Sequence, residues 1–146
     1  MKNRGLLFLI FIVTAIFWRG TVAAEFGCKE KNIVPRVLPK RAINVPMLEI
    51  TCWSGEKDFW ITDIYVERQG LSSFTDIDSV RAVVPYLRNR RTSLRSDDSA
   101  RIRFWQPLRI LANFSQKITV VANLDLKGRG RTVGITLKSI VGYREK

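Results

Sequence analysis

Apolar and polar side chains alternate almost without interruption between residues 117 and 127. Every second position is apolar: Ile118, Val120, Ala122, Leu124 and Leu126. Polar residues fill most of the positions between them, and only Val121 breaks that series. A repeat of two is typical of a β-strand with one buried face, because successive side chains of a strand point to opposite sides. This stretch therefore predicts a half-buried strand.

A second alternating stretch, residues 133–138, follows the segment Lys127-Gly128-Arg129-Gly130. Glycine adopts the positive φ angles that tight turns between strands require. We therefore expect residues 117–140 to form one antiparallel hairpin. Two strands alone are marginally stable in water, so a second sheet must cover the apolar face.

The rest of the chain offers further short strands separated by turn signals. The alternating stretches are residues 48–52, 59–68, 80–84, 101–105, 108–111, 117–127 and 133–138. Beyond the N-terminal segment, no stretch shows the spacing of an amphipathic helix for more than one turn. About seven short strands at intervals of roughly ten residues predict an all-β antiparallel sandwich.

The N-terminus has the features of a secretory signal peptide. Residues 1–4 are basic, an apolar run extends from Leu6 to Trp18, and small residues lie at 21–24. We predict a cleaved signal over residues 1–24, with a retained membrane anchor as the alternative. The apolar run is shorter than the roughly 20 residues that span a bilayer, so no stable transmembrane span is expected after processing. The expected location is secreted, periplasmic or on the surface of a bacterial cell.

Proline and basic residues dominate the segment that follows. Residues 25–46 contain Pro35, Pro39 and Pro46, which disfavour a helix or a central strand. We expect an extended basic arm at 25–46 and a β-sandwich domain at 47–146. Apolar positions in the arm would allow it to add a strand to the open sheet of a partner: Ile33, Val34, Val37 and Leu38.

Cys28 and Cys52 are the two cysteines of the chain. Export would place them where disulfides form, and their spacing differs from that of Cys-x-x-Cys redox motifs. We therefore predict one structural disulfide between them.

The chain is strongly basic, with 25 Lys and Arg against 13 Asp and Glu, a net charge of +12. Residues 1–24 contain three basic and no acidic residues, so the processed chain has a net charge of +9. Such a field favours polyanions such as nucleic acid or an acidic glycan, although a merely soluble basic surface would have the same composition. The candidate binding residues lie in two basic segments: Arg88, Arg90, Arg91 and Arg95, and Lys127, Arg129 and Arg131. They would form one patch if both segments lie at the same end of the sandwich.

Several short phrases occur in a recognisable order. They are Phe74-Thr75-Asp76-Ile77-Asp78-Ser79-Val80-Arg81, Ile102-Arg103-Phe104, Leu108-Arg109-Ile110 and the strand 118–126 with its partner from Val133. This order, over roughly residues 47–142, resembles the immunoglobulin-like modules of bacterial cell-surface and S-layer-type proteins. The resemblance implies an immunoglobulin-like sandwich and a scaffold role in surface layers, adhesion or envelope assembly, without catalysis.

The residues offer little for catalysis or for metal binding. The chain has no histidine, which excludes Ser-His-Asp and Cys-His systems and histidine-ligated zinc. We expect no enzymatic activity and no cofactor. Asp76 and Asp78 are candidates for calcium, although the segment around them lacks the glycine and the terminal glutamate of an EF-hand. Trp53, Trp60 and Trp105 would either stack on sugars or pack in the fold.

Together these features predict an exported, non-enzymatic module for interaction or assembly at the cell envelope or surface. Its partner would be another envelope or surface protein, or further copies of itself. The alternative is a secreted polyanion-binding protein whose basic loops contact nucleic acid or an acidic glycan.

Overall fold

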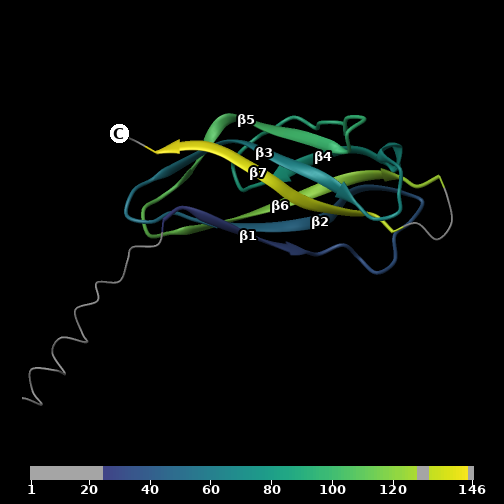
Figure 1. The fold of residues 1–146 in the computed structure, drawn as a ribbon, viewed down its shortest axis with the longest axis horizontal. Helices are drawn as coiled ribbons and strands as arrows, with labels where there is room; N and C mark the ends of the chain where they lie inside the picture. The colour runs from purple at the N-terminus through teal and green to yellow at the C-terminus, as the bar shows by residue number, and fades with distance from the viewer. Residues whose placement is uncertain (1–24, 128–131, 145–146) are drawn as a thin grey trace, which may run out of the picture.

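The computed structural model describes residues 25–127 and 132–144. Within them, seven strands form two antiparallel sheets, ordered β1-β2-β6-β4 and β5-β3-β7 (Figure 1). The elements are β1 (Gly27–Asn32), β2 (Arg41–Trp53), β3 (Phe59–Gln69), the short 3-10 helix η1 (Phe74–Asp76), β4 (Ile77–Val83), β5 (Ser99–Ile110), β6 (Ser115–Asp125) and β7 (Gly134–Arg144). The predicted all-β sandwich is confirmed.

The predicted signal peptide, residues 1–24, lies outside the described residues. Within the described ranges, no helix is long and apolar enough to cross a membrane.

The core lies between the two sheets. The larger sheet contributes Leu48, Ile50, Cys52, Ile118, Val120, Ala122 and Leu124, and the smaller contributes Ile61, Ile64, Val66, Ala100, Ile102, Phe104, Leu108 and Ile110. The apolar positions at 118–124 are therefore buried, as their alternation predicts. Val121, which breaks the polar series, is also buried, and its cross-strand neighbours are Pro46 and Arg81.

The predicted hairpin over residues 117–140 is wrong. Both of its strands exist, but β6 pairs with β2 and β4 in the larger sheet, whereas β7 pairs with β3 in the smaller one. Both edges of β6 are occupied, so β7 has no place beside it. The segment between them connects the two sheets. Alternation shows which face of a strand is buried but carries no information about its neighbours.

Much of the expected arm at residues 25–46 belongs to the larger sheet. Strand β1 pairs with β2 over its whole length, and β2 begins at Arg41. Pro46 lies where the register between β2 and β6 shifts, a position that tolerates proline because the hydrogen-bond ladder is already interrupted. The predicted disulfide is confirmed, and Cys28 and Cys52 are direct cross-strand partners.

The connections between strands cross repeatedly from one sheet to the other. From β3 to β7, each strand lies in the other sheet from the strand before it. Among the strands of the described residues, only β1 and β2 are both consecutive in sequence and paired with each other. The connection from β4 to β5 is long, and it contains the arginine-rich segment that the sequence singled out.

Candidate polyanion-binding site

The arginine-rich connection between β4 and β5 runs along the side of the sandwich. Val80 of β4 exchanges two backbone hydrogen bonds with Thr92, of 2.8 and 2.9 Å. Asn89 forms an isolated antiparallel bridge with Phe104 of β5. The segment thus contacts an edge of each sheet. The arginine-rich connection is therefore held against both β4 and β5 and does not project freely from the sandwich.

Strand β5 bulges where this connection meets it. Opposite Thr62 of β3, β5 has the four residues 104–107, where a regular ladder would have one. Pro107 fits such a bulge because it lacks a backbone N–H. Within the bulge, Trp105 projects into solvent with 62% of its surface exposed. The irregular strand therefore displays a large aromatic ring beside the arginine-rich connection.

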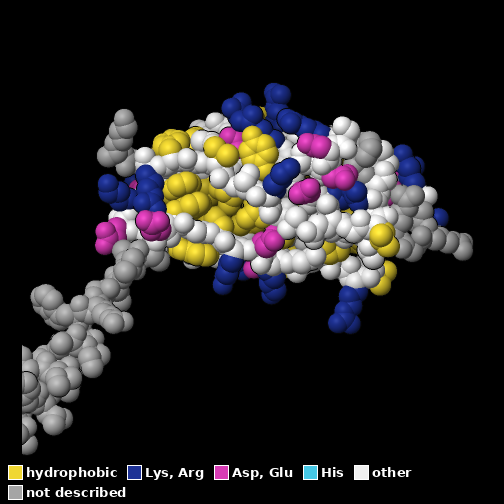
Figure 2. All heavy atoms as spheres, viewed as in Figure 1, with side chains coloured by type: hydrophobic (Ala, Val, Ile, Leu, Met, Phe, Trp, Pro, Cys, Tyr) yellow, Lys and Arg dark blue, Asp and Glu magenta, His cyan; other side chains and the backbone are white. Residues whose placement is uncertain are grey.

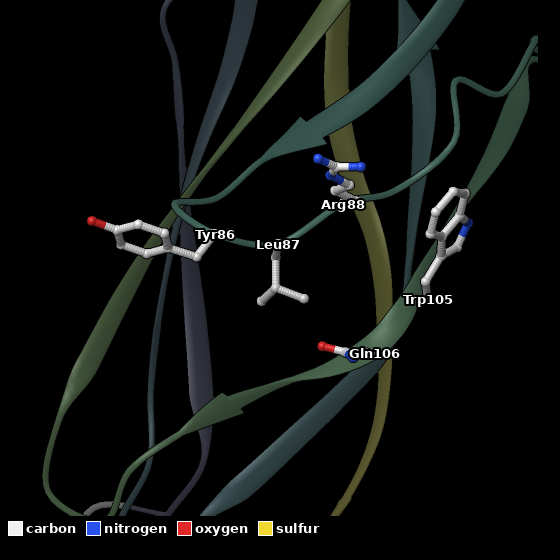
Figure 3. Close-up of a pocket in the computed structure, with 5 residues that line it drawn as sticks. All are labelled: Tyr86, Leu87, Arg88, Trp105 and Gln106. Atoms are coloured by element: carbon white, nitrogen blue, oxygen red, sulfur yellow. The ribbon is translucent and has the colours of Figure 1, made fainter.

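Arginines surround this ring. Three adjoining hollows, of about 200, 300 and 530 Å³, all include Trp105 in their walls. We define the Trp105 surface as Trp105 with the arginines that line these hollows: Arg81, Arg88, Arg90, Arg91 and Arg103. In Figure 3, Leu87 and Gln106 point toward each other from the connection and from β5, Trp105 lies beside them, and Tyr86 points away. The guanidinium carbon of Arg90 lies 5.9 Å from the centre of the Trp105 ring.

The charges of three of these arginines are not neutralised locally. In the described part of the chain, Arg81, Arg88 and Arg90 form no ion pair with a carboxylate. The Nε of Arg81 is buried and has no hydrogen-bond partner there. A bound anion would offset the positive charge that these guanidinium groups bring to the surface.

Arg91 and Arg103 have different partners. Arg91 donates to the side-chain oxygens of Asn123 (2.8 Å) and Asn44 (2.6 Å), which are neutral and leave its charge uncancelled. Arg103 lies 3.6 Å from Asp63 but keeps 71% of its side chain exposed. Asp63 is held more closely by Arg101, whose Nε donates to it at 2.7 Å. That hydrogen bond lowers the pKa of Asp63, so this carboxylate is ionised at neutral pH. Its negative charge offsets that of Arg101 more than that of the more distant Arg103.

The structure brings only part of the predicted patch together. Arg88, Arg90 and Arg91 belong to the Trp105 surface, whereas neither Arg95 nor Lys127 lines its hollows. Lys127 follows the end of β6, where its backbone N–H donates to Asp76. Arg129 and Arg131 lie outside the described residues.

Two residues of the site, Arg81 and Arg103, were not singled out from the sequence as binding candidates, whereas Trp105 was considered for stacking on sugars. Each occupies a position that alternates with buried residues, as in Ile102, Arg103 and Phe104. That pattern already indicated outward-pointing side chains. It did not indicate that strand residues and the connection lie together, which is a consequence of the bulge in β5.

The calcium candidates serve other purposes in the structure. Asp76 is fully buried, and its two carboxylate oxygens accept hydrogen bonds from the N–H groups of Ser73 (2.8 Å) and Lys127 (3.1 Å). It thereby ties η1 to the end of β6. Asp78 is exposed and accepts a hydrogen bond from the Ser79 hydroxyl at 3.4 Å. Across residues 25–127 and 132–144, no three His, Cys, Asp or Glu side chains are grouped so that they would hold a metal ion.

The Trp105 surface combines unpaired guanidinium groups with an exposed indole ring. Guanidinium groups bind phosphate, sulfate and carboxylate through two parallel hydrogen bonds, and an indole face stacks on flat or weakly polar rings. The arrangement is suited to reversible binding of an anionic polymer. No family model, curated protein or solved structure matches this chain.

Proposed function

We propose that this protein is an exported, non-enzymatic protein of the bacterial cell envelope or surface that binds polyanions through the Trp105 surface. The observation that carries the proposal is the gathering of Arg81, Arg88 and Arg90, without carboxylate partners among the described residues, around an exposed ring. The net charge of +9 expected after processing supports it, because it raises the rate of encounter with polyanions. In Figure 2, Lys and Arg side chains gather over the β5 side of the molecule.

In this proposal the sandwich is an immunoglobulin-like scaffold, and residues 1–24 direct its export. The division into four and three strands is that of a constant-type immunoglobulin domain. In that domain the fifth strand lies between the second and the fourth, whereas here β6 has that place. The scaffold's contribution is to hold the connection between β4 and β5 against two sheet edges.

The structure of the arm gives less support to assembly by strand donation than the Trp105 surface gives to polyanion binding. Ile33 donates its N–H to the carbonyl of Met47, and Val34 and Leu38 pack against the core. Of the four apolar arm residues, Val37 alone is largely exposed, at 82% of its surface. Donating this segment to a partner would require these contacts to break.

The test is the salt dependence of binding to a simple polyanion. Residues 25–146 contain every strand of the sandwich and would be titrated with long-chain polyphosphate between about 50 and 200 mM salt. We expect log affinity to fall linearly with log salt, because binding releases counterions. In the variant Arg88→Ser/Arg90→Ser, the slope should flatten by about 1.4, or roughly 0.7 for each lost contact with a single strand.

The matched control removes the same charge from elsewhere. Arg36→Ser/Lys40→Ser alters two exposed cations in the loop between β1 and β2 and should leave the slope near that of the parent protein. Binding that does not respond to salt would contradict the proposal. Equal losses in both double variants would also contradict it, because they would show that net charge alone, without a particular site, governs binding.

A further inference from the structure

Besides its part in the Trp105 surface, strand β5 contributes arginines to a second group of outward-facing residues. Its arginines at 101 and 109 lie on the outer face of the smaller sheet, opposite aromatic residues of β3: Arg109 pairs with Trp60, and Arg101 pairs with Tyr65. On the other side of β3, Trp60 pairs with Tyr143 of β7. We call these five residues the aromatic face.

Within the aromatic face, rings and guanidinium groups are stacked in space. The rings of Trp60 and Tyr143 are nearly parallel, with an angle of 9° and centres 6.3 Å apart. The guanidinium carbon of Arg109 lies 5.1 Å from the centre of the Trp60 ring, and that of Arg101 lies 5.8 Å from the centre of the Tyr65 ring. Tyr143 keeps 51% of its surface exposed. The sheet therefore presents flat groups to solvent at positions fixed by the strand register.

Carboxylates fix the orientation of these two arginines. Asp58 accepts a hydrogen bond of 2.6 Å from Arg109, and Asp63 accepts one of 2.7 Å from Arg101. Each guanidinium charge is offset by its carboxylate partner. Arg101 and Arg109 would therefore contribute to binding mainly as flat surfaces for stacking, and less through attraction of negative charge. The uncancelled charge lies on the Trp105 surface, so the two regions offer different interactions to a ligand.

The two regions are continuous along β5. Arg103 of the Trp105 surface lies two residues from Arg101, on the same side of the strand, and both contact Asp63. Alternate residues of a strand are about 6.6 Å apart, so one extended polymer would reach both regions. Such a ligand needs negative groups for one region and flat rings for the other.

We propose that the Trp105 surface and the aromatic face together bind single-stranded nucleic acid. This inference rests on the proposed polyanion binding and names the class of polymer. Unpaired bases expose faces that stack on aromatic rings and on guanidinium planes, while the phosphates bind arginine. A duplex hides these faces, polyphosphate has no rings, and the saturated rings of an acidic glycan lack π faces.

The test compares two ligands that differ only in their bases. An oligothymidylate of about 15 nucleotides and an abasic oligonucleotide of the same length carry the same phosphates. With residues 25–146, fluorescence anisotropy should show the thymidylate binding at least about tenfold more tightly. Tyr143→Leu should lower thymidylate affinity by about fivefold or more and leave abasic binding unchanged. Tyr143→Phe, which keeps the ring, should bind as the parent protein does.

A control variant and the remaining outcomes separate the two proposals. Phe114→Leu removes an exposed ring from the turn between β5 and β6, outside the aromatic face, and should change neither affinity. Equal affinity for both oligonucleotides, or tighter binding of duplex DNA or heparin than of thymidylate, would overturn the inference. In those cases a salt-dependent loss in Arg88→Ser/Arg90→Ser would still support polyanion binding. Failure of every polyanion to bind at low salt would overturn both proposals.

Discussion

The side-chain amide of Asn89 hydrogen-bonds both backbone groups of Ala82. The Ala82 N–H donates to Oδ1 at 3.1 Å, and the Asn89 Nδ2 donates to the Ala82 carbonyl at 2.7 Å. One side chain thus pairs with the edge of β4 as a neighbouring strand would. Because Asn89 stands between Arg88 and Arg90, this contact fixes the part of the connection that carries the unpaired charges.

Asn89→Ala should weaken polyanion binding without unfolding the sandwich. Freed from Ala82, the connection would have to be ordered on binding, and we expect polyphosphate affinity to fall by up to about tenfold. Calorimetric titration measures the change. Asn32→Ala, at the end of β1, removes the side-chain oxygen that accepts a hydrogen bond from the Val34 N–H and should leave affinity unchanged. Unchanged affinity in Asn89→Ala, despite faster hydrogen exchange at Ala82, would show that the site does not need this contact.

Removing the disulfide should destabilise the fold markedly. The bond between Cys28 and Cys52 closes a loop of sequence separation 24, for which the chain-entropy model gives about 3 kcal/mol. Urea denaturation of Cys28→Ala/Cys52→Ala should show a loss of that size. The parent protein measured in reductant should give the same result. A loss well below about 1 kcal/mol would mean that restricting this loop contributes little to stability.

Stability should fall at acid pH partly through Asp63. Its hydrogen bond from Arg101 lowers its pKa in the folded state, so the unfolded chain binds a proton more readily. The stabilisation is therefore complete above the unfolded pKa of about 3.9, and it disappears as pH falls through the lower folded pKa. Asp63→Asn should cost about 1–3 kcal/mol at neutral pH and flatten the decline of stability below about pH 5.

Denaturation midpoints measured between about pH 2 and pH 7 would reveal this difference. Arg101→Gln removes the donor and should flatten the same part of the curve. If Asp63→Asn retains the full acid dependence of the parent protein, other carboxylates must cause it.

Gly142 of β7 has no room for a side chain. A Cβ atom there would lie 2.2 Å from the carbonyl oxygen of Trp60 and 2.5 Å from the ring of Phe59. Gly142→Ala should therefore push β7 from β3 and lower the free energy of unfolding by about 1–3 kcal/mol. Gly134, at the other end of the same strand, has its nearest neighbour at 3.7 Å, so Gly134→Ala should be much better tolerated. Equal stability losses in thermal denaturation would refute the steric explanation.

The sequence predicted most strands but not their neighbours. Alternation located the strands at 117–127 and 133–138 because burial of one face is a local property of the sequence. The pairing of β6 with β2 depends on contacts between residues far apart in the chain, and it leaves no periodic signal. The sequence predicts two strands at 101–105 and 108–111, whereas Pro107 lies in a bulge of the single strand β5.

Only part of the candidate site was predicted, because local clusters are visible in the sequence and contacts between distant segments are not. Arg88, Arg90 and Arg91 stood out as a cluster in the sequence, and they are close together in the structure. Trp105 joins them only because β5 bulges at that point and the connection from β4 crosses it. The prolines at 35, 39 and 46 predict an extended arm, but residues 27–32 contain no proline and form strand β1.

The repeated crossing between sheets affects the order in which the protein can form. When the chain emerges N-terminus first from a ribosome or an export channel, most strands emerge well before the strands with which they pair. Strand β2 cannot pair with β6, nor β3 with β7, until nearly the whole chain has emerged. Folds dominated by such distant pairings form slowly. The β1–β2 pair is the exception, and its facing cysteines need no other part of the chain. Oxidation of Cys28 and Cys52 can therefore precede the sandwich and hold its first two strands together until the last one arrives.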